Sequence, residues 1–210
     1  EGQDTDGHAG IGHTRWATHG APNDVNSHPH VSMSGELSII HNGIIENYAA
    51  IKKQLIGKGY EFKSDTDTEV LVNLIEHIKK EGNLSLGEAV RMALNEVVGA
   101  FAICVIEQNF PDTIVAAKKS SPLVIGVGNG EYFLASDATP IIEYTKNVVY
   151  LDDNEIAILK KGEPLQMFSV ANEPKEPFVQ ELSMELETIE KGGYEHFMLK
   201  EIYEQPSSVR

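Results

Sequence analysis

The chain has 210 residues and carries 32 acidic against 17 basic side chains, which gives a formal net charge of −15 at neutral pH. Binding to nucleic acid or to an anionic membrane needs clustered Lys and Arg, so this balance argues against both kinds of partner. The sequence contains no apolar run of roughly 18 or more residues, so no membrane-spanning helix is predicted. We therefore expect a soluble protein.

The chain contains a single cysteine, Cys104. One thiol excludes an internal disulfide and a zinc site made of several thiolates of one chain, and it is compatible with a reducing compartment, so we expect a cytoplasmic protein. The chain starts with Glu1 instead of Met and stops at Arg210 directly after a helical pattern. These ends suggest a fragment of a longer protein.

The first part of the chain predicts two strands, over 8–16 and 37–41. The residues between them, 17–29, are rich in Gly, Pro, Asn and Ser and predict a loop. An apolar periodicity over 47–58 then predicts a short helix that is closed by Gly59.

Two longer helices are expected next. Thr66 and Glu69 have the spacing of a capping box at the start of the second helix, which Gly82 ends. Ser85 and Glu88 repeat the capping-box pattern at the start of the third helix. Both helices have an apolar stripe at helical spacing, so each is expected to bury one face.

Short apolar runs at regular spacing predict a meander of strands after Gly99. These strands cover residues 101–107, 113–117, 123–128, 132–136, 148–151, 155–159 and 165–170. Two strand-rich stretches that flank consecutive helices are typical of an α+β domain with antiparallel sheets and helices on their faces. They do not favour an alternating parallel sheet.

Histidines are concentrated near the start of the chain. Six of the eight histidines and the only tryptophan fall within the first 41 residues: His8, His13, Trp16, His19, His28, His30 and His41. No His-Glu-x-x-His or Cys-bearing pattern surrounds these imidazoles, so we predict no metal site and no cofactor. We expect the imidazoles to pack around a polar active-site loop.

The run HTRWATHG over 13–20 is the first candidate for chemistry. A strand end can hold the planar guanidinium of Arg15 for a bidentate bond to a carboxylate, with a hydroxyl and an imidazole nearby to fix its orientation. Arg and Trp at a strand end also serve structural roles. The residue types alone favour the structural interpretation.

The pair Asn42-Gly43 is the second candidate. Asn-Gly after an apolar strand is the commonest dipeptide of tight hairpin turns, so a turn is the favoured interpretation. The alternative is an oxyanion hole, in which the Asn42 amide and the Gly43 backbone N–H point at one spot. The residues that follow, 44–46, resemble the entry into a helix more than a returning hairpin strand.

Asp67, inside the predicted capping box of the second helix, is the third candidate. The helix dipole stabilises an acid in the first turn whatever its function, so this position alone does not indicate a site. The same carboxylate is suited to bind a substrate ammonium group. Both interpretations stay open.

Seven motifs occur in an order that resembles the glutaminase domain of the glutamine–fructose-6-phosphate aminotransferases, the glucosamine-6-phosphate synthases. The motifs are HTRWATHG (13–20), NSHPH (26–30), HNGIIEN (41–47), SDTDTE (64–69), SPLVIG (121–126), ASD (135–137) and MLKEIYEQP (198–206). The resemblance covers the whole chain. The last motif separates this family from other class II amidotransferases.

The resemblance implies an N-terminal-nucleophile (Ntn) hydrolase fold, a four-layer αββα sandwich of two antiparallel sheets, here lacking its first strand and helix. It also implies a glutaminase domain over 1–196 and, over 197–210, the start of a linker toward a sugar-isomerase domain outside this chain. Members of the family hydrolyse L-glutamine and use the ammonia to convert fructose 6-phosphate to glucosamine 6-phosphate in amino-sugar synthesis. We expect the full-length enzyme to be a homo-oligomer.

The resemblance also implies residue roles. Arg15 would bind the α-carboxylate of glutamine, and Asp67, assisted by Gly43, would bind its α-ammonium group. Asn42 and the Gly43 backbone N–H would form the oxyanion hole. These roles describe a pocket that is specific for an α-amino acid.

Thr18 and His19 would line the same pocket, and Trp16 would gate the passage of ammonia. The nucleophile of the family is a cysteine at the mature N-terminus. Glu1 cannot replace a thiolate, and Cys104 lies in an apolar strand with no base in reach. We therefore expect this chain to bind glutamine but not to hydrolyse it.

Other interpretations stay open. A different class II amidotransferase would share the roles of Arg15, Asn42 and Asp67 but pass ammonia to another acceptor. A non-catalytic glutamine-binding or regulatory module would have no nucleophilic cysteine in its parent protein. An upstream peptide that stays associated with the chain would complete the site.

Overall fold

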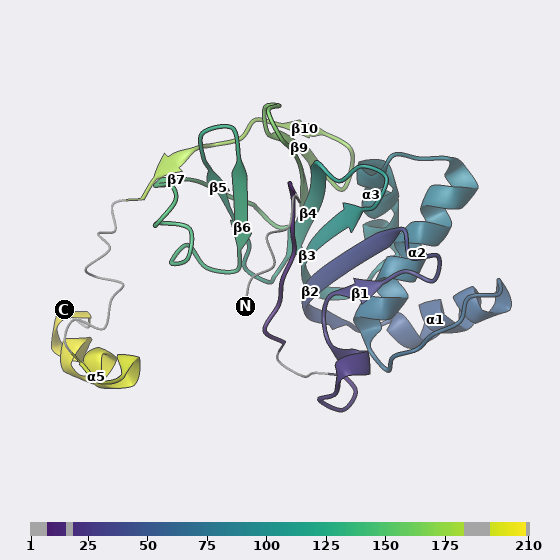
Figure 1. Cartoon of the computed structure of the whole chain (residues 1–210), viewed down its shortest axis with the longest axis horizontal. Helices are drawn as coiled ribbons and strands as arrows, with labels where there is room; N and C mark the ends of the chain where they lie inside the picture. The colour runs from purple at the N-terminus through teal and green to yellow at the C-terminus, as the bar shows by residue number, and fades with distance from the viewer. Residues whose placement is uncertain (1–7, 16–18, 183–193, 209–210) are drawn as a thin grey trace.

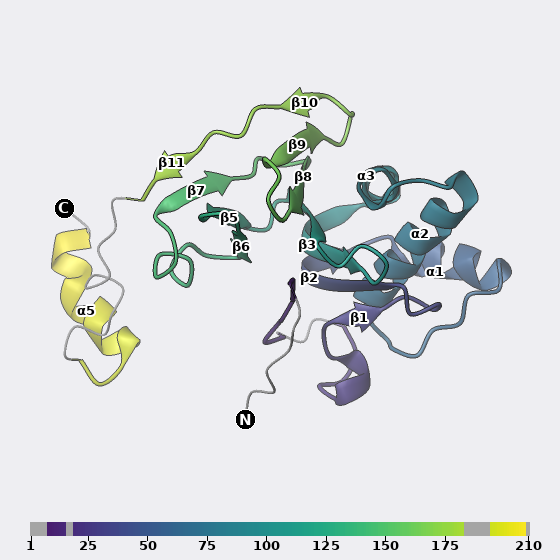
Figure 2. The ribbon, with the colours of Figure 1, turned by 45° about the horizontal axis from the view of Figure 1, so that its top comes forward.

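The computed structural model describes residues 8–15, 19–182 and 194–208. The strands in these ranges are β1 (His30–Val31), β2 (Leu37–Ile45), β3 (Gly99–Glu107), β4 (Thr113–Lys119), β5 (Val124–Val127), β6 (Tyr132–Ala135), β7 (Asn147–Tyr150), β8 (Glu155–Lys160), β9 (Gln166–Ser169), β10 (Pro174–Lys175) and β11 (Gln180–Glu181). They form two antiparallel sheets, one with the order β1-β2-β3-β4-β8-β9-β10 and one with the order β11-β7-β5-β6 (Figures 1 and 2). The predicted meander after Gly99 is confirmed.

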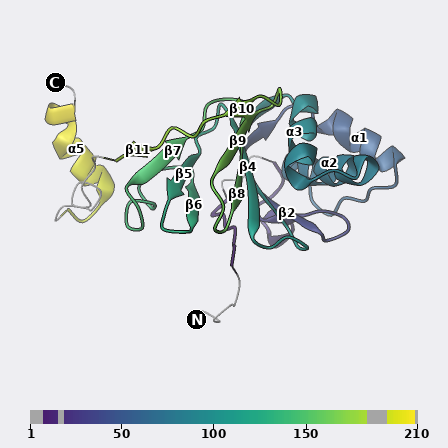
Figure 3. The ribbon, with the colours of Figure 1, turned by 90° about the horizontal axis from the view of Figure 1, so that it is seen from above.

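Three consecutive helices connect β2 to β3: α1 (Tyr48–Gly57), α2 (Asp67–Gly82) and α3 (Leu86–Glu96). Seen from above, they cover one face of the larger sheet, and the smaller sheet lies on the opposite side (Figure 3). The core under the helices joins Ile39 of β2 and Ile103 of β3 to Ile75 of α2. Burial of these branched side chains, worth about 1.5–3 kcal/mol each, holds the helices on the sheet.

A second core lies between the two sheets. Ala102 and Ala116 of the larger sheet pack with Ile125 and Val149 of the smaller one. The two sheets therefore form a sandwich, as the resemblance to the Ntn hydrolase fold implies.

The outer face of the smaller sheet carries a short turn segment. Val124 and Val148 alternate with the inward residues of β5 and β7 and pack against Ile141. Residues 138–145 form turns there instead of a helix, so the described residues supply one helix layer and two sheet layers of the expected four. The last helix, α5 (Phe197–Ser208), stands apart from both sheets (Figure 2).

The start of α2 differs from the predicted capping box. The Thr66 hydroxyl accepts the Glu69 backbone N–H at 3.2 Å, as expected. The Glu69 carboxylate, however, accepts the backbone N–H groups of Lys63 and Ser64 at 2.8 and 2.7 Å, not that of Thr66. Glu69 therefore shapes the loop before the helix.

The other helix ends follow the sequence more closely. Ser85 and Glu88 form the complete capping box of α3. Gly82 was expected to end α2, but it is the last helical residue, and Asn83 adopts the left-handed conformation (φ +47°) that closes the helix. Asn tolerates this conformation better than most residues other than Gly.

The predicted strand over 8–16 is wrong for the residues described. Residues 8–15 have no ladder partner in the described part of the chain. Ile11 contacts the core between the sheets, but Gly10 and Gly12 beside it have no side chain to pack. None of the helices within the described ranges is long and apolar enough to cross a bilayer.

Candidate active site

β2 carries Asn42 and Gly43 to the site. The predicted turn at this pair is wrong, because β2 pairs with β3 without interruption from Leu37 to Ile45. Gly43 has φ +130°, and a Cβ atom there would lie 2.1 Å from the Ala100 carbonyl oxygen, so no other residue fits. Gly43 thus allows β2 and β3 to approach each other closely at this point.

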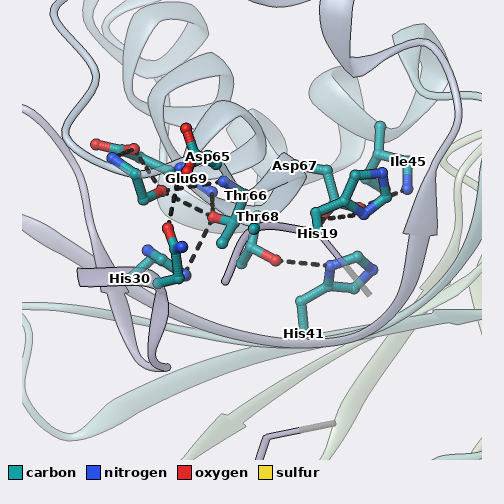
Figure 4. A network of polar contacts seen from close by, with 12 residues as sticks. His19, His30, His41, Ile45, Asp65, Thr66, Asp67, Thr68 and Glu69 are labelled. Carbon is teal, nitrogen blue, oxygen red and sulfur yellow. Dashed lines mark hydrogen bonds and ion pairs between the residues drawn. The ribbon is translucent and has the colours of Figure 1, made fainter. Parts of the chain in front are cut away.

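Asp67 is the first residue of α2 and its side chain is 3% exposed. Its Oδ2 atom accepts the Ile45 backbone N–H at 2.8 Å, and its Oδ1 atom lies 3.6 Å from the Nδ1 atom of His19 (Figure 4). The helix N-terminus favours a negative charge at this position. A buried carboxylate oxygen therefore faces the site.

Arg15 comes from the segment before η1 (Asp24–Asn26) and has a left-handed backbone, with φ +52°. Its guanidinium donates to the carbonyl oxygens of His19 and Ala21 at 3.1 and 3.2 Å. These bonds brace the loop and leave further N–H groups of the fork for a ligand. Arg15 thus has a structural contact as well as a position on the site.

His13 links Arg15 to Asn42. Its Nδ1 atom accepts the Arg15 backbone N–H at 2.8 Å, and its Nε2 atom is 2.7 Å from Oδ1 of Asn42. The sequence indicated no specific role for His13, because its partner Asn42 is 29 residues away. Its place two residues before Arg15 was the one available signal.

Three further histidines lie at the site: His28 and His41 line its cavity, and His30 lies behind Thr66. Hydroxyls of the α2 start contact two of them: Thr66 lies 3.1 Å from His30 Nε2, and Thr68 lies 3.0 Å from His41 Nδ1 (Figure 4). Burial, reinforced by neighbouring imidazoles, lowers the pKa of His28 to about 3, and burial also lowers the pKa values of His30 and His41. The lowered pKa values of His28, His30 and His41 all favour the neutral imidazole.

Together these groups enclose a cavity of about 240 Å³. Its lining residues are His13, Arg15, His19, His28, His41, Asn42, Gly43, Thr66, Asp67 and Thr68. The structure thus brings together Arg15, His19, Asn42, Gly43 and Asp67 of the predicted site. Trp16 and Thr18 lie outside the described residues. No group of three potential metal ligands occurs among the residues that are described.

A second cavity, of about 380 Å³, adjoins the first and shares His13, His41 and Asn42 with it. Cys104 of β3 lies in its wall but is itself buried. Burial raises the pKa of the Cys104 thiol to about 12, so the thiolate that a nucleophile requires is scarcely populated at neutral pH.

Comparison with known proteins identifies the class. Residues 1–169 match the glutamine amidotransferase domain family, and the chain belongs to that family. Its fold is the sandwich of the Ntn amidotransferases: it resembles the glutamine phosphoribosylpyrophosphate amidotransferase of B. subtilis with a TM-score of 0.62 and 26% identity, over 75% of this chain and 34% of that one.

Comparison with whole curated proteins indicates a narrower group of relatives within this family. The chain is 56% identical to the glutamine–fructose-6-phosphate aminotransferases of Bacteroides thetaiotaomicron and Chlorobaculum tepidum, over 99% and 96% of its length. It covers 34% and 33% of those two proteins. The chain thus spans about a third of the curated relatives it matches and is homologous to their glutaminase part.

Proposed function

We propose that this chain binds L-glutamine in the cavity of about 240 Å³ and forms the glutaminase domain of a longer enzyme. The observation that carries the proposal is the convergence of a guanidinium, a carboxylate and a side-chain amide on one small cavity. Drug-sized ligands occupy pockets of roughly 300–1,000 Å³, so this smaller volume suits a small metabolite. The three groups match the three polar parts of glutamine.

Each binding role follows from the chemistry of one group. Arg15 binds the α-carboxylate with the free N–H groups of its fork, and Asp67 binds the α-ammonium group with Oδ1. Asn42 and the Gly43 N–H stabilise the oxyanion that forms when the side-chain amide is attacked. His19, beside Asp67, lines the same pocket. From the resemblance alone, Thr18 would line this pocket too, and Trp16 would gate the passage of ammonia.

In the longer enzyme, we propose that the released ammonia converts fructose 6-phosphate to glucosamine 6-phosphate. The identity to two aminotransferases named for fructose 6-phosphate supports this acceptor. The glutaminase domain would cover 1–196, and α5 would start the linker, since it begins at Phe197 and exposes Met198 and Tyr203. The full-length protein would be a cytoplasmic homo-oligomer.

Calorimetric titration of the 210-residue chain with L-glutamine tests the binding site, with D-glutamine as the control. Binding of the L-isomer alone supports the proposal, because Arg15 and Asp67 fix two substituents of the α-carbon. Absence of binding would contradict the proposal for this chain. Ammonia transfer to fructose 6-phosphate by the full-length protein tests the acceptor, and transfer only to another acceptor would assign the domain to a different amidotransferase.

A further inference from the structure

The imidazole of His13 uses both ring nitrogens within the site. Nδ1 lies 2.8 Å from the backbone nitrogen of Arg15, and Nε2 lies 2.7 Å from Oδ1 of Asn42. One ring therefore contacts both the carboxylate-binding residue and the oxyanion-hole residue. The ring also packs against His28, with centroids 4.4 Å apart.

The two bonds determine where the ring proton is. A backbone N–H can only donate, so His13 Nδ1 must accept from Arg15 and carries no proton. In the neutral ring the proton is then on Nε2, which donates to Asn42. A doubly protonated imidazole would lose the bond to Arg15.

The proton on Nε2 in turn determines the orientation of the Asn42 amide. Only the carbonyl oxygen of Asn42 can accept from His13, so its NH₂ group points away from the imidazole. That NH₂ group is the donor that an oxyanion hole needs. In the flipped amide, an oxygen would face the developing negative charge and repel it.

The other bond supports the backbone of Arg15. Arg15 has φ +52°, a conformation that costs a residue with a side chain roughly 1–2 kcal/mol. The acceptor at His13 Nδ1 holds the Arg15 backbone N–H in this conformation. The direction in which the Arg15 side chain leaves the backbone therefore depends on the same imidazole.

We propose that His13 is a positioning residue that orients the Asn42 amide with Nε2 and the Arg15 backbone with Nδ1, so that one ring positions a residue of the proposed glutamine-binding site and a residue of the proposed oxyanion hole. The inference rests on the proposed glutamine site. It assigns no proton transfer to His13.

Two matched substitutions separate the two bonds. In His13→Gln the amide nitrogen reaches the position of Nε2, which keeps the donor to Asn42 and removes the acceptor for Arg15. In His13→Asn the amide oxygen reaches the position of Nδ1, which keeps the acceptor and removes the donor. His77→Gln, at a histidine on α2 that does not line the cavity, is the control.

Glutaminase kinetics of the full-length protein supply the first measurement. We expect His13→Gln to raise KM for glutamine about tenfold with a nearly unchanged kcat, because a misplaced Arg15 guanidinium weakens ground-state binding. We expect His13→Asn to lower kcat about tenfold or more with a nearly unchanged KM. The control should change neither. Equal losses in both variants would indicate a purely structural role and overturn the inference.

Nitrogen-15 NMR of the unsubstituted 210-residue chain supplies a measurement that needs no variant and no turnover. We expect the His13 ring to carry a proton on Nε2 and none on Nδ1. A proton on Nδ1 would overturn the inference. If the full-length protein releases no glutamate but the His13 proton is on Nε2, the proposed function fails and the geometry around His13 stands. If the protein releases glutamate but the His13 proton is on Nδ1, only the inference about His13 fails.

Discussion

The carboxylate of Asp67 accepts the backbone N–H of Ile45 at 2.8 Å, so the first residue of α2 is bonded to the last residue of β2. Ile45 lies two residues beyond Gly43 on the same strand. One side chain therefore sets the distance between the helix start and the proposed oxyanion hole, while its second oxygen lines the cavity.

This double role predicts different effects for two substitutions of Asp67. Asp67→Asn retains an oxygen for Ile45 but loses the charge, so glutamine affinity should fall by about 1.5–3 kcal/mol with a small loss of stability. Asp67→Ala also leaves the Ile45 N–H without its partner, which should cost about 1–3 kcal/mol of unfolding free energy. Calorimetry and urea denaturation measure the two effects. Equal affinity of Asp67→Asn and the unsubstituted chain would remove Asp67 from the binding site.

Arg15→Lys tests the proposed binding of the glutamine α-carboxylate by Arg15. Lysine keeps the charge but has no planar fork, so glutamine affinity should fall by roughly 1.5–3 kcal/mol, the range for a charged hydrogen bond. The comparison with D-glutamine shows whether stereoselectivity is lost as well. Unchanged affinity would limit Arg15 to bracing the carbonyl groups of His19 and Ala21.

Gly43→Ala should destabilise the protein by more than about 2 kcal/mol, because the new Cβ would lie 2.1 Å from the Ala100 oxygen and the backbone has φ +130°. Gly35→Ala is the matched control, since Gly35 also has a positive φ, +86°, but open space around it. Urea denaturation of both variants separates the collision from the backbone strain. Similar losses of stability would show that β2 and β3 move apart to admit a side chain.

Cys104 should be unreactive. Its thiol is buried in β3 and its pKa is raised to about 12, so iodoacetamide should label the folded chain very slowly and the unfolded chain rapidly at neutral pH.

The pure 210-residue chain should release no glutamate from glutamine. Release that persists in Cys104→Ala would reveal another nucleophile and contradict the expectation that this chain binds glutamine without hydrolysing it.

Stability should depend on pH through His28. Burial lowers its pKa in the folded state to about 3, below the value of 6.5 expected for the unfolded chain. The unfolded state therefore binds more protons between these values, and stability is lost as the pH falls from 6.5 toward 3. In His28→Asn, which keeps an acceptor for the His41 N–H, this part of the acid dependence should disappear in denaturation curves. An unaltered dependence would assign it to other groups.

Much of the architecture follows from local sequence patterns. The short apolar runs after Gly99 and the Ser85–Glu88 box predicted strands and a helix start that the structure contains, because these signals depend on neighbouring residues. The segment 8–16 shows the limit of such patterns. An extended run becomes a strand only where a partner edge is present, and residues 8–15 have none among the described strands.

The sequence by itself determined the fold class, the family motifs and the set of polar residues that could bind an α-amino acid, because residue type and spacing are local properties. Only the tertiary structure decided that Asn42-Gly43 lies in a strand, that Asp67 bonds Ile45, and that His13 joins Arg15 to Asn42. Asp67 lies 22 residues from Ile45 along the chain, and His13 lies 29 residues from Asn42. The packing of α2 against β2 brings Asp67 to Ile45. The segment 8–15, which contacts the core between the sheets through Ile11, brings His13 to Asn42.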